Sequence, residues 1–150
     1  MQKKVVFDFD GTLADTFGQM LSLVKEFRPD LSKEQIEIYR ELGAKKAKEK
    51  LGISLREIFR IMRVVKIKQK EIITEAEVFD GMDKLIARLR EEGVEVGILS
   101  SNSKENIEKW LKEKGIEVDW VRSESTIFGK EKAIKKVKSE GMFYVGDVVS

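Results

Sequence analysis

The chain has 150 residues, a length that suits one domain or a compact core with a small insertion. Its 29 basic and 27 acidic residues nearly balance, so the net charge favours neither a nucleic-acid partner nor a membrane partner. The sequence has no cysteine and no histidine, which excludes disulfides, thiolate metal sites, cysteine nucleophiles and histidine-based catalysis. Metal or acid–base chemistry must therefore use carboxylates, lysines and hydroxyls, and such oxygen donors favour a hard cation such as Mg²⁺.

Targeting signals are not evident in the sequence. The apolar run Val5-Val6-Phe7 is too short for a signal peptide and meets a charge at Asp8. No stretch approaches the roughly 20 apolar residues that a membrane-spanning helix needs. We therefore expect a cytoplasmic protein without a membrane partner.

The first predicted element is a buried strand over Lys4–Phe9, because its apolar run is nearly continuous rather than alternating. Residues 15–79 then show helical spacing and no strand. The first apolar stripe of this segment ends near Pro29 and consists of Phe17, Met20, Leu21 and Val24. An all-helical segment between two strands predicts an insertion that forms a separate small domain.

Two capping boxes begin the other helices of the insertion. Ser32 and Gln35 begin a helix that we expect to end at Gly43, and Ser54 with Glu57 begins a longer helix. The apolar face expected for the longer helix consists of Leu55, Ile58, Phe59, Met62 and Val65. Its basic side consists of Arg56, Arg60, Arg63, Lys66 and Lys70. Such a side is typical of a solvated surface, and recognition of an anionic substrate tail or of nucleic acid is the alternative.

Strands and helices alternate from residue 80 onward. Further strands are expected over Val94–Leu99, Val118–Val121 and Met142–Val145. The predicted helices are one from Met82 that stops at Gly93, one capped by Ser103 that stops at Gly115, and one over Lys130–Ser139 that stops at Gly141. This alternation predicts an α/β fold, a Rossmann-like three-layer core in which helices cover both faces of a parallel sheet. Ligands of such sheets bind at the carboxyl ends of the strands.

Asp8-Phe9-Asp10-Gly11-Thr12-Leu13 follows the first strand. Carboxylates two residues apart on a strand point the same way, and the glycine permits a sharp turn. Two such carboxylates raise each other's pKa, so the pair makes sense around a cation or with one acid protonated. The alternative is a turn in which aspartates cap loose backbone donors.

This hexapeptide resembles the first motif of the haloacid dehalogenase-like superfamily, and the order of the elements resembles its phosphoglycolate phosphatase-like branch. The resemblance implies a core over 1–14 and 80–150 and a helical cap over 15–79. It also implies that Asp8 is the nucleophile and that Asp10 is the general acid and base. Both residues would contribute to a Mg²⁺ site.

Three later motifs complete the resemblance. It implies that Thr12, Ser100, Ser101 and Asn102 bind the substrate phosphate, with Ser100 favoured over Ser101 as the hydroxyl donor. Lys130 would pair with the nucleophile and the phosphate, with Lys132 as a competitor. Asp147 would ligate Mg²⁺. A second acidic residue normally follows about four positions later, so we expect further core beyond Ser150.

The function implied by the resemblance is Mg²⁺-dependent hydrolysis of a small, phosphoglycolate-like phosphomonoester through an aspartyl-phosphate. A phosphosugar mutase would use the same motifs and is the nearest alternative. A non-catalytic module that binds a phospho-ligand is a second alternative, although such a module would not need the acid Asp10. The expected partner is a small phosphorylated metabolite and not a nucleic acid, and the expected state is a monomer or homodimer.

Overall fold

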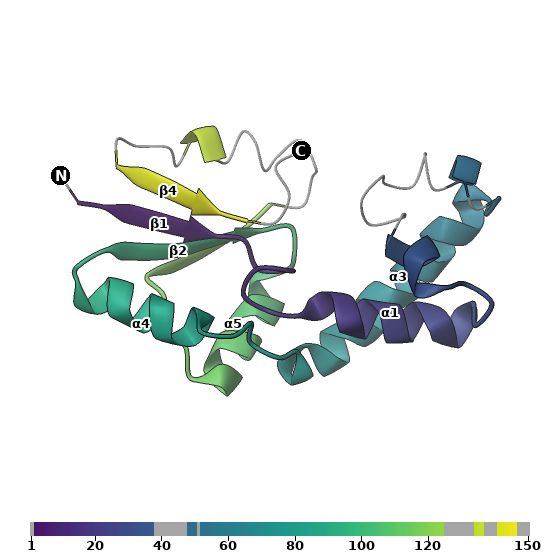
Figure 1. The fold of residues 1–150 in the computed structure, drawn as a ribbon, viewed down its shortest axis with the longest axis horizontal. Helices are drawn as coiled ribbons and strands as arrows, with labels where there is room; N and C mark the ends of the chain where they lie inside the picture. The colour runs from purple at the N-terminus through teal and green to yellow at the C-terminus, as the bar shows by residue number, and fades with distance from the viewer. Residues whose placement is uncertain (1, 38–47, 51, 125–133, 137–140, 147–150) are drawn as a thin grey trace. The chain divides into compact units, whose positions relative to one another are not determined.

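The computed structural model describes residues 2–37, 48–50, 52–124, 134–136 and 141–146. Contacts divide the chain into two compact units. The first, which we call the core unit, comprises Met1–Thr16 and Ile73–Ser150, and the second, the helical unit, comprises Phe17–Ile72. Figure 1 shows the sheet in the core unit and helices α1 and α3 in the other. Within the described residues, no helix is long and apolar enough to cross a membrane.

The core unit is built on one parallel sheet of four strands in the order β3-β2-β1-β4. The strands are β1 (Lys4–Phe7), β2 (Glu95–Ser100), β3 (Trp120–Ser123) and β4 (Met142–Val145). All four predicted strands are therefore confirmed, with β4 at its predicted bounds and the others shifted by one or two residues. The α/β fold class is confirmed as well.

Helices cover the sheet because both of its faces are apolar. Phe7, Val96 and Ile98 pack in one cluster with Ile86 of α4 (Met82–Glu91) and with α5 (Lys104–Lys114). Figure 1 shows α4 and α5 on the same face of the sheet. The opposite face carries a second cluster that includes Val6, Leu99, Trp120 and Ile134. Burial on both faces explains why the strand sequences are continuously apolar.

The ends of α5 are as predicted. Ser103 caps its first turn by accepting a hydrogen bond from the backbone N–H of Asn106 at 3.2 Å. Gly115 ends the helix in the left-handed conformation with φ of 66°, which glycine adopts without strain. Of the helix predicted over 130–139, residues 134–136 are helical and the rest lie outside the described residues.

The helical unit is shorter than the predicted insertion over 15–79. The core unit retains η1 (Ile73–Glu75), a short 3₁₀ helix that packs against α5. An isolated antiparallel bridge also joins Ala14 to Val78, so the chain leaves and re-enters the core unit at neighbouring points. These contacts explain why residues 73–79 belong with the sheet. That the two units act as a catalytic core and its cap stays a prediction.

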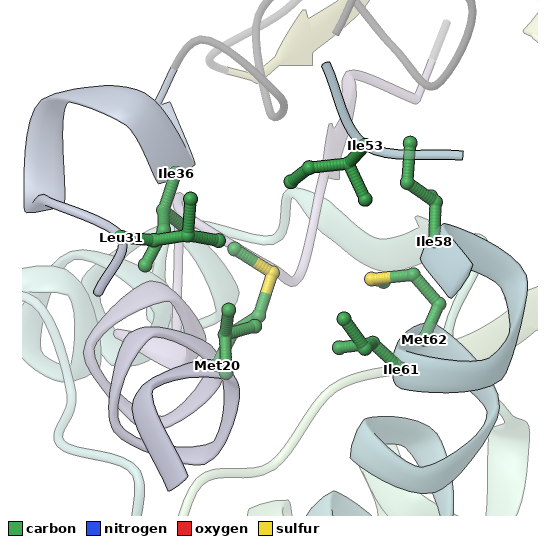
Figure 2. Close-up of a pocket in the computed structure, with 8 residues that line it drawn as sticks. Met20, Leu31, Ile36, Ile53, Ile58, Ile61 and Met62 are labelled. Atoms are coloured by element: carbon green, nitrogen blue, oxygen red, sulfur yellow. The ribbon is translucent and has the colours of Figure 1, made fainter. Parts of the chain in front are cut away.

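The helical unit has an apolar core of its own. It contains α1 (Thr16–Phe27), helical residues 33–37 and α3 (Leu55–Ile72). The buried side chains are Leu23, Val24, Leu31, Ile36, Ile53, Ile58, Ile61 and Val65. Figure 2 shows a hollow that is lined by six of these side chains and by Met20 and Met62. Its volume is about 40 Å³. Its lining offers no charged or hydrogen-bonding side chain, so it does not suit a phosphate.

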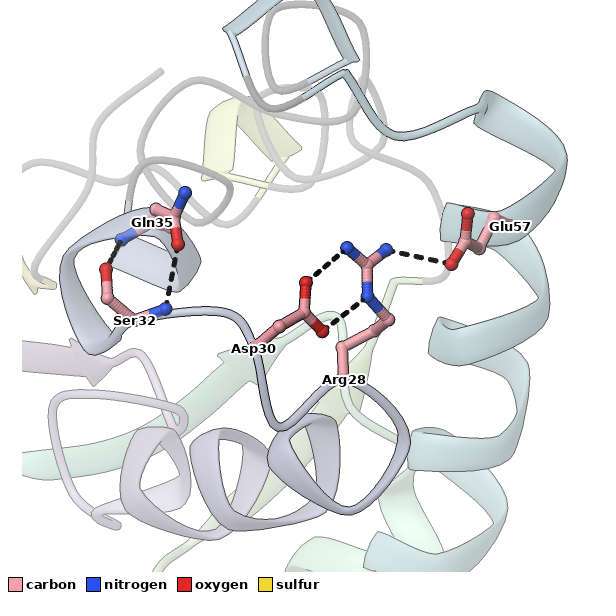
Figure 3. Close-up of polar contacts among 5 residues, drawn as sticks. All are labelled: Arg28, Asp30, Ser32, Gln35 and Glu57. Atoms are coloured by element: carbon pink, nitrogen blue, oxygen red, sulfur yellow. Dashed lines mark hydrogen bonds and ion pairs between the residues drawn. The ribbon is translucent and has the colours of Figure 1, made fainter.

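Polar contacts at the helix ends are drawn in Figure 3. The predicted capping box of Ser32 and Gln35 is confirmed, with reciprocal hydrogen bonds of 2.8 and 3.2 Å. At the second box Ser54 accepts from the Glu57 N–H at 3.2 Å, while the Glu57 carboxylate accepts from Arg28 at 2.9 Å. Arg28 also donates two parallel hydrogen bonds, of 2.8 and 2.7 Å, to the Asp30 carboxylate. Arg28 thus ties the end of α1 to the first turn of α3.

One prediction for α3 is wrong. Phe59 was expected on the apolar face, but its side chain is 65% exposed. Residues three and four apart share a helix face, so Phe59 lies with Arg56 and Arg63 rather than with the buried Ile58. The basic side predicted for this helix is exposed, as Arg56, Arg60, Arg63, Lys66 and Lys70 show.

Candidate active site

The turn after β1 fixes two carboxylates at the carboxyl edge of the sheet. Phe9, between Asp8 and Asp10, is fully buried, and its ring contacts Trp110 of α5 edge-on with centroids 5.1 Å apart. Trp110 is itself held by a hydrogen bond from its indole N–H to the Ala76 carbonyl at 2.8 Å. Because Phe9 is packed into the core, its two acidic neighbours are held at the edge of the sheet.

Backbone hydrogen bonds make this turn tight. The Phe9 carbonyl accepts hydrogen bonds from the N–H groups of Thr12, Leu13 and Ala14, at 3.3, 3.0 and 3.1 Å. Gly11 has φ of 75°, a conformation that strains residues with a Cβ atom. The glycine of the motif is therefore required by the turn, which ends β1 at Phe7, before the predicted Phe9.

Side chains from the end of β2 meet Asp10. The hydroxyl of Ser100, which is fully buried, donates to Asp10 Oδ2 at 3.3 Å and accepts from the Asn102 N–H at 3.1 Å. The side-chain amide of Asn102 donates to Asp10 Oδ1 at 3.2 Å. Ser101 is exposed, so of the two adjacent serines Ser100 is the one that lies against the carboxyl group.

The protonation of Asp10 is set by opposing influences. Burial raises the pKa of Asp10 above its ordinary value, and the nearby charge of Asp8 adds to the rise. Hydrogen bonds from Thr16, Asn102 and Ser100 favour the ionised form and oppose that rise in pKa. The net effect is a raised pKa, which would suit a carboxyl group that holds and releases a proton.

Thr12 carries an unused hydrogen-bonding group. Its hydroxyl oxygen is buried and has no hydrogen-bond partner in the part of the chain that the structure describes. Buried polar atoms are normally paired, so an unpaired one suggests a missing ligand or ion. A hydroxyl four residues after Asp8 could donate to a phosphate oxygen.

The carboxylates fit a hard cation. Asp8 is 6% exposed, and Asp8 and Asp10 raise the energy of each other's charge, so a bound cation would relieve the repulsion. Carboxylate oxygens are the donors that Mg²⁺ prefers. Among the described residues no group of three acidic side chains could hold a metal. Asp147 and Lys130 lie outside the described residues, as does Lys132.

The position of β4 bears on Asp147. β4 pairs with β1 in parallel register, with Val145 opposite Phe7. The Asp8 N–H donates to the Val145 carbonyl at 2.8 Å. The chain therefore leaves β4 at the same edge of the sheet as Asp8.

Two residues near Asp10 were not predicted as site residues from the sequence. Thr16 is 5% exposed and hydrogen-bonds to the Asp10 carboxyl, and Asn106 is 7% exposed and donates to Asn102 at 3.0 Å. Thr16 stands at the start of a helix, where a threonine is ordinary. Asn106 could have been noticed as a polar residue at a position that the helical spacing of Ile107 and Trp110 places near the core.

Comparison with known proteins identifies the family of this chain. The family described as haloacid dehalogenase-like hydrolase matches residues 5–149. A phosphoglycolate phosphatase of Synechococcus elongatus is 29% identical over 156 residues, which cover 95% of this chain and 74% of that protein.

Solved structures share the fold. A haloacid dehalogenase-like family hydrolase from Streptococcus pneumoniae gives a TM-score of 0.75 at 16% identity, covering 97% of this chain and 76% of that one. A superfamily hydrolase from Geobacter sulfurreducens gives 0.66 at 18% identity, covering 98% and 79%. At these identities the likeness concerns the fold alone. From the match over nearly its whole length, the chain belongs to the haloacid dehalogenase-like hydrolase family, as a phosphatase.

Proposed function

We propose that this phosphatase hydrolyses a small phosphomonoester through an aspartyl-phosphate on Asp8. The observation that carries the proposal is the surroundings of Asp10. Its carboxyl group lies near Asp8, burial raises its pKa, and two side chains donate to it at 3.2 and 3.3 Å. A carboxyl group held in this way suits general acid–base catalysis beside a nucleophile.

The reaction would have two steps. A carboxylate oxygen of Asp8 attacks the phosphorus, the ester P–O bond breaks, and Asp10 gives its proton to the leaving oxygen. Asp10 then takes a proton from water, the water oxygen attacks the phosphorus, and the bond to Asp8 breaks. Inorganic phosphate is released, and both carboxyl groups return to their starting states.

Magnesium is part of the proposal. Asp8, the backbone carbonyl of Asp10, and Asp147 would hold the ion, whose positive charge would offset the negative charge of the phosphate. Thr12 and Ser100 would bind phosphate oxygens with their hydroxyls and Ser101 and Asn102 with their backbone amides, and Lys130 would supply a cation near them. Ser100 is favoured over Ser101 because its hydroxyl lies at the Asp10 carboxyl.

The substrate class comes from the named relative. A phosphoglycolate phosphatase is 29% identical to this chain, so a short acidic phosphate ester is the first candidate. The helical unit would act as the cap that selects the ester and excludes water during transfer. The partner is then a small phosphorylated metabolite, in a cytoplasmic enzyme that works as a monomer or homodimer.

Phosphate release from a panel of small phosphomonoesters, with Mg²⁺ present, tests the proposal. Wild type is compared with Asp8→Asn, and Asp80→Asn serves as the control because Asp80 is an exposed aspartate of the same unit. We expect Mg²⁺-dependent turnover in wild type and in the control, and none in Asp8→Asn. Turnover that survives Asp8→Asn would show that Asp8 is not the nucleophile.

A further inference from the structure

We infer that Asn106 is a positioning residue for Asp10, because it fixes the orientation of the Asn102 side-chain amide. The inference rests on the proposed role of Asp10 as general acid and base. Three polar side chains lie in sequence, from Asn106 to Asn102 to Asp10, joined by hydrogen bonds of 3.0 and 3.2 Å. Asn106 does not touch the reacting groups and acts through Asn102.

The orientation of the Asn102 amide follows from its partners. Its Oδ1 accepts from the backbone N–H of Ser103 at 2.8 Å and from Nδ2 of Asn106 at 3.0 Å. A backbone N–H can only donate, so the oxygen of this amide must face Ser103. Its NH₂ group then faces Asp10 Oδ1 at 3.2 Å. The flipped amide would set an oxygen against a carboxylate and an NH₂ against an N–H, so it would lose all three bonds.

Helix capping does not require Asn106. Asn106 is the third residue after the N-cap Ser103, the place where a capping box has a Glu or Gln that accepts from the N-cap N–H. Here Asn102 accepts from that N–H at 2.8 Å instead. The Asn106 side chain therefore takes no part in the cap and donates to Asn102 instead.

Asn106 also lowers the stability of the folded chain. The side chain is 7% exposed, and its Oδ1 is buried without a hydrogen-bond partner among the residues that the structure describes. A buried acceptor without a partner destabilises the folded state. An apolar residue would avoid that loss, so the asparagine is better explained by its donor bond to Asn102 than by stability.

The inference predicts an effect on turnover and not on phosphate binding. Without Asn106 the Asn102 amide keeps one of its two anchoring bonds, and its NH₂ leaves Asp10 for part of the time. The carboxyl group then loses one of the donors that hold it in place for proton transfer. Misplacement of a catalytic group lowers the rate steeply, so we expect kcat to fall roughly 10-fold.

The experiment measures kcat, KM and inhibition by inorganic phosphate for Asn106→Leu and Asn106→Asp. Leucine has a similar size and no polar atom, whereas ionised aspartate keeps the shape but cannot donate. Each variant is also made in an Asn102→Ala background. Leu111→Ala is the control, because Leu111 is a buried residue of the same helix without a polar contact to Asn102.

We expect both Asn106 variants to lose about 10-fold in kcat, with KM and phosphate inhibition within about 2-fold of wild type. Neither variant should lower kcat further when Asn102 is already alanine, since the two residues act as one unit. An unchanged kcat overturns the inference. A loss of the same size in the Asn102→Ala background, or in Leu111→Ala, also overturns it.

A second readout does not depend on activity. The NMR signal of the Asn102 side-chain NH₂ is identified by its absence in Asn102→Ala. We expect Asn106→Leu to shift this signal and to speed its exchange with water. A wild-type chain that releases no phosphate overturns the proposed function, whereas an Asn102 signal that Asn106→Leu leaves unchanged overturns the positioning inference.

Discussion

The two units of this chain bury different kinds of side chain. The buried polar side chains of the described residues are Asp8, Thr16, Ser100 and Asn106. All four belong to the core unit and lie next to Asp10 or next to a residue that contacts it. In the helical unit, the buried side chains of the described residues are all apolar. Buried polar groups lower stability unless they are paired, so their presence in one place marks where function has shaped the molecule.

The units also differ in charge. Residues 17–72 contain 14 basic and 8 acidic residues, for a formal charge of +6, whereas the rest of the chain contains 15 and 19, for −4. The near-neutral total therefore conceals a basic helical unit. Much of this charge lies on the exposed side of α3, where Arg56, Arg60 and Arg63 follow one another at helical spacing.

The largest effect should come from Asp10→Asn. We expect phosphate release to fall by roughly 100-fold or more, because the variant removes the proposed acid and base. We also expect the variant to melt at a higher temperature than wild type at pH 7 without metal.

The sign of the stability change follows from the raised pKa of Asp10 in the folded state. As pH rises through that pKa, the folded chain must ionise a buried group, so it loses stability that an asparagine retains. Thermal melting with a chelator checks this expectation. A lower melting temperature for Asp10→Asn would mean that the charge is well solvated and that the core unit has no such cost.

The second test compares the two apolar cores. Ile98→Ala in β2 and Ile61→Ala in α3 each remove a buried side chain, and each should cost about 2–5 kcal/mol in the unit that contains it. Because the units have separate clusters, hydrogen exchange should speed up mainly in the unit that carries the substitution. Equal acceleration in both units would show that they unfold as one.

The smallest effect concerns pH and the helical unit. Hydrogen bonds from Arg28 lower the pKa of Asp30, so this pair stabilises the fold at neutral pH. That contribution should be lost as pH falls from about 4, the ordinary pKa of an aspartate, through the lowered pKa of Asp30 in the folded chain. Hydrogen exchange in α1 at pH 7 and pH 3 measures the loss, and Asp30→Asn should remove the pH dependence. The stability from Asp30 thus falls as pH falls, whereas the stability from Asp10 falls as pH rises.

Local signals in the sequence predicted the local structure well. The capping box of Ser32 and Gln35 and the α5 ends at Ser103 and Gly115 are confirmed, because caps depend on hydrogen bonds within a few residues. Phe59 was placed on the wrong face of α3. Leu55, Ile58 and Phe59 all fit an apolar stripe by type, and only the packed structure shows which of them it buries.

The sequence by itself determined the strands, the helical insertion and the turn of Asp8, Asp10 and Gly11, since these depend on periodicity and on glycine at a positive φ. Only the tertiary structure decided that Ser100 rather than Ser101 meets Asp10, and that Thr16 and Asn106 join the same network. Ser100 and Asp10 are 90 positions apart in the chain. Their contact depends on the register between β1 and β2, where a shift of one residue would turn the other serine toward the carboxyl group.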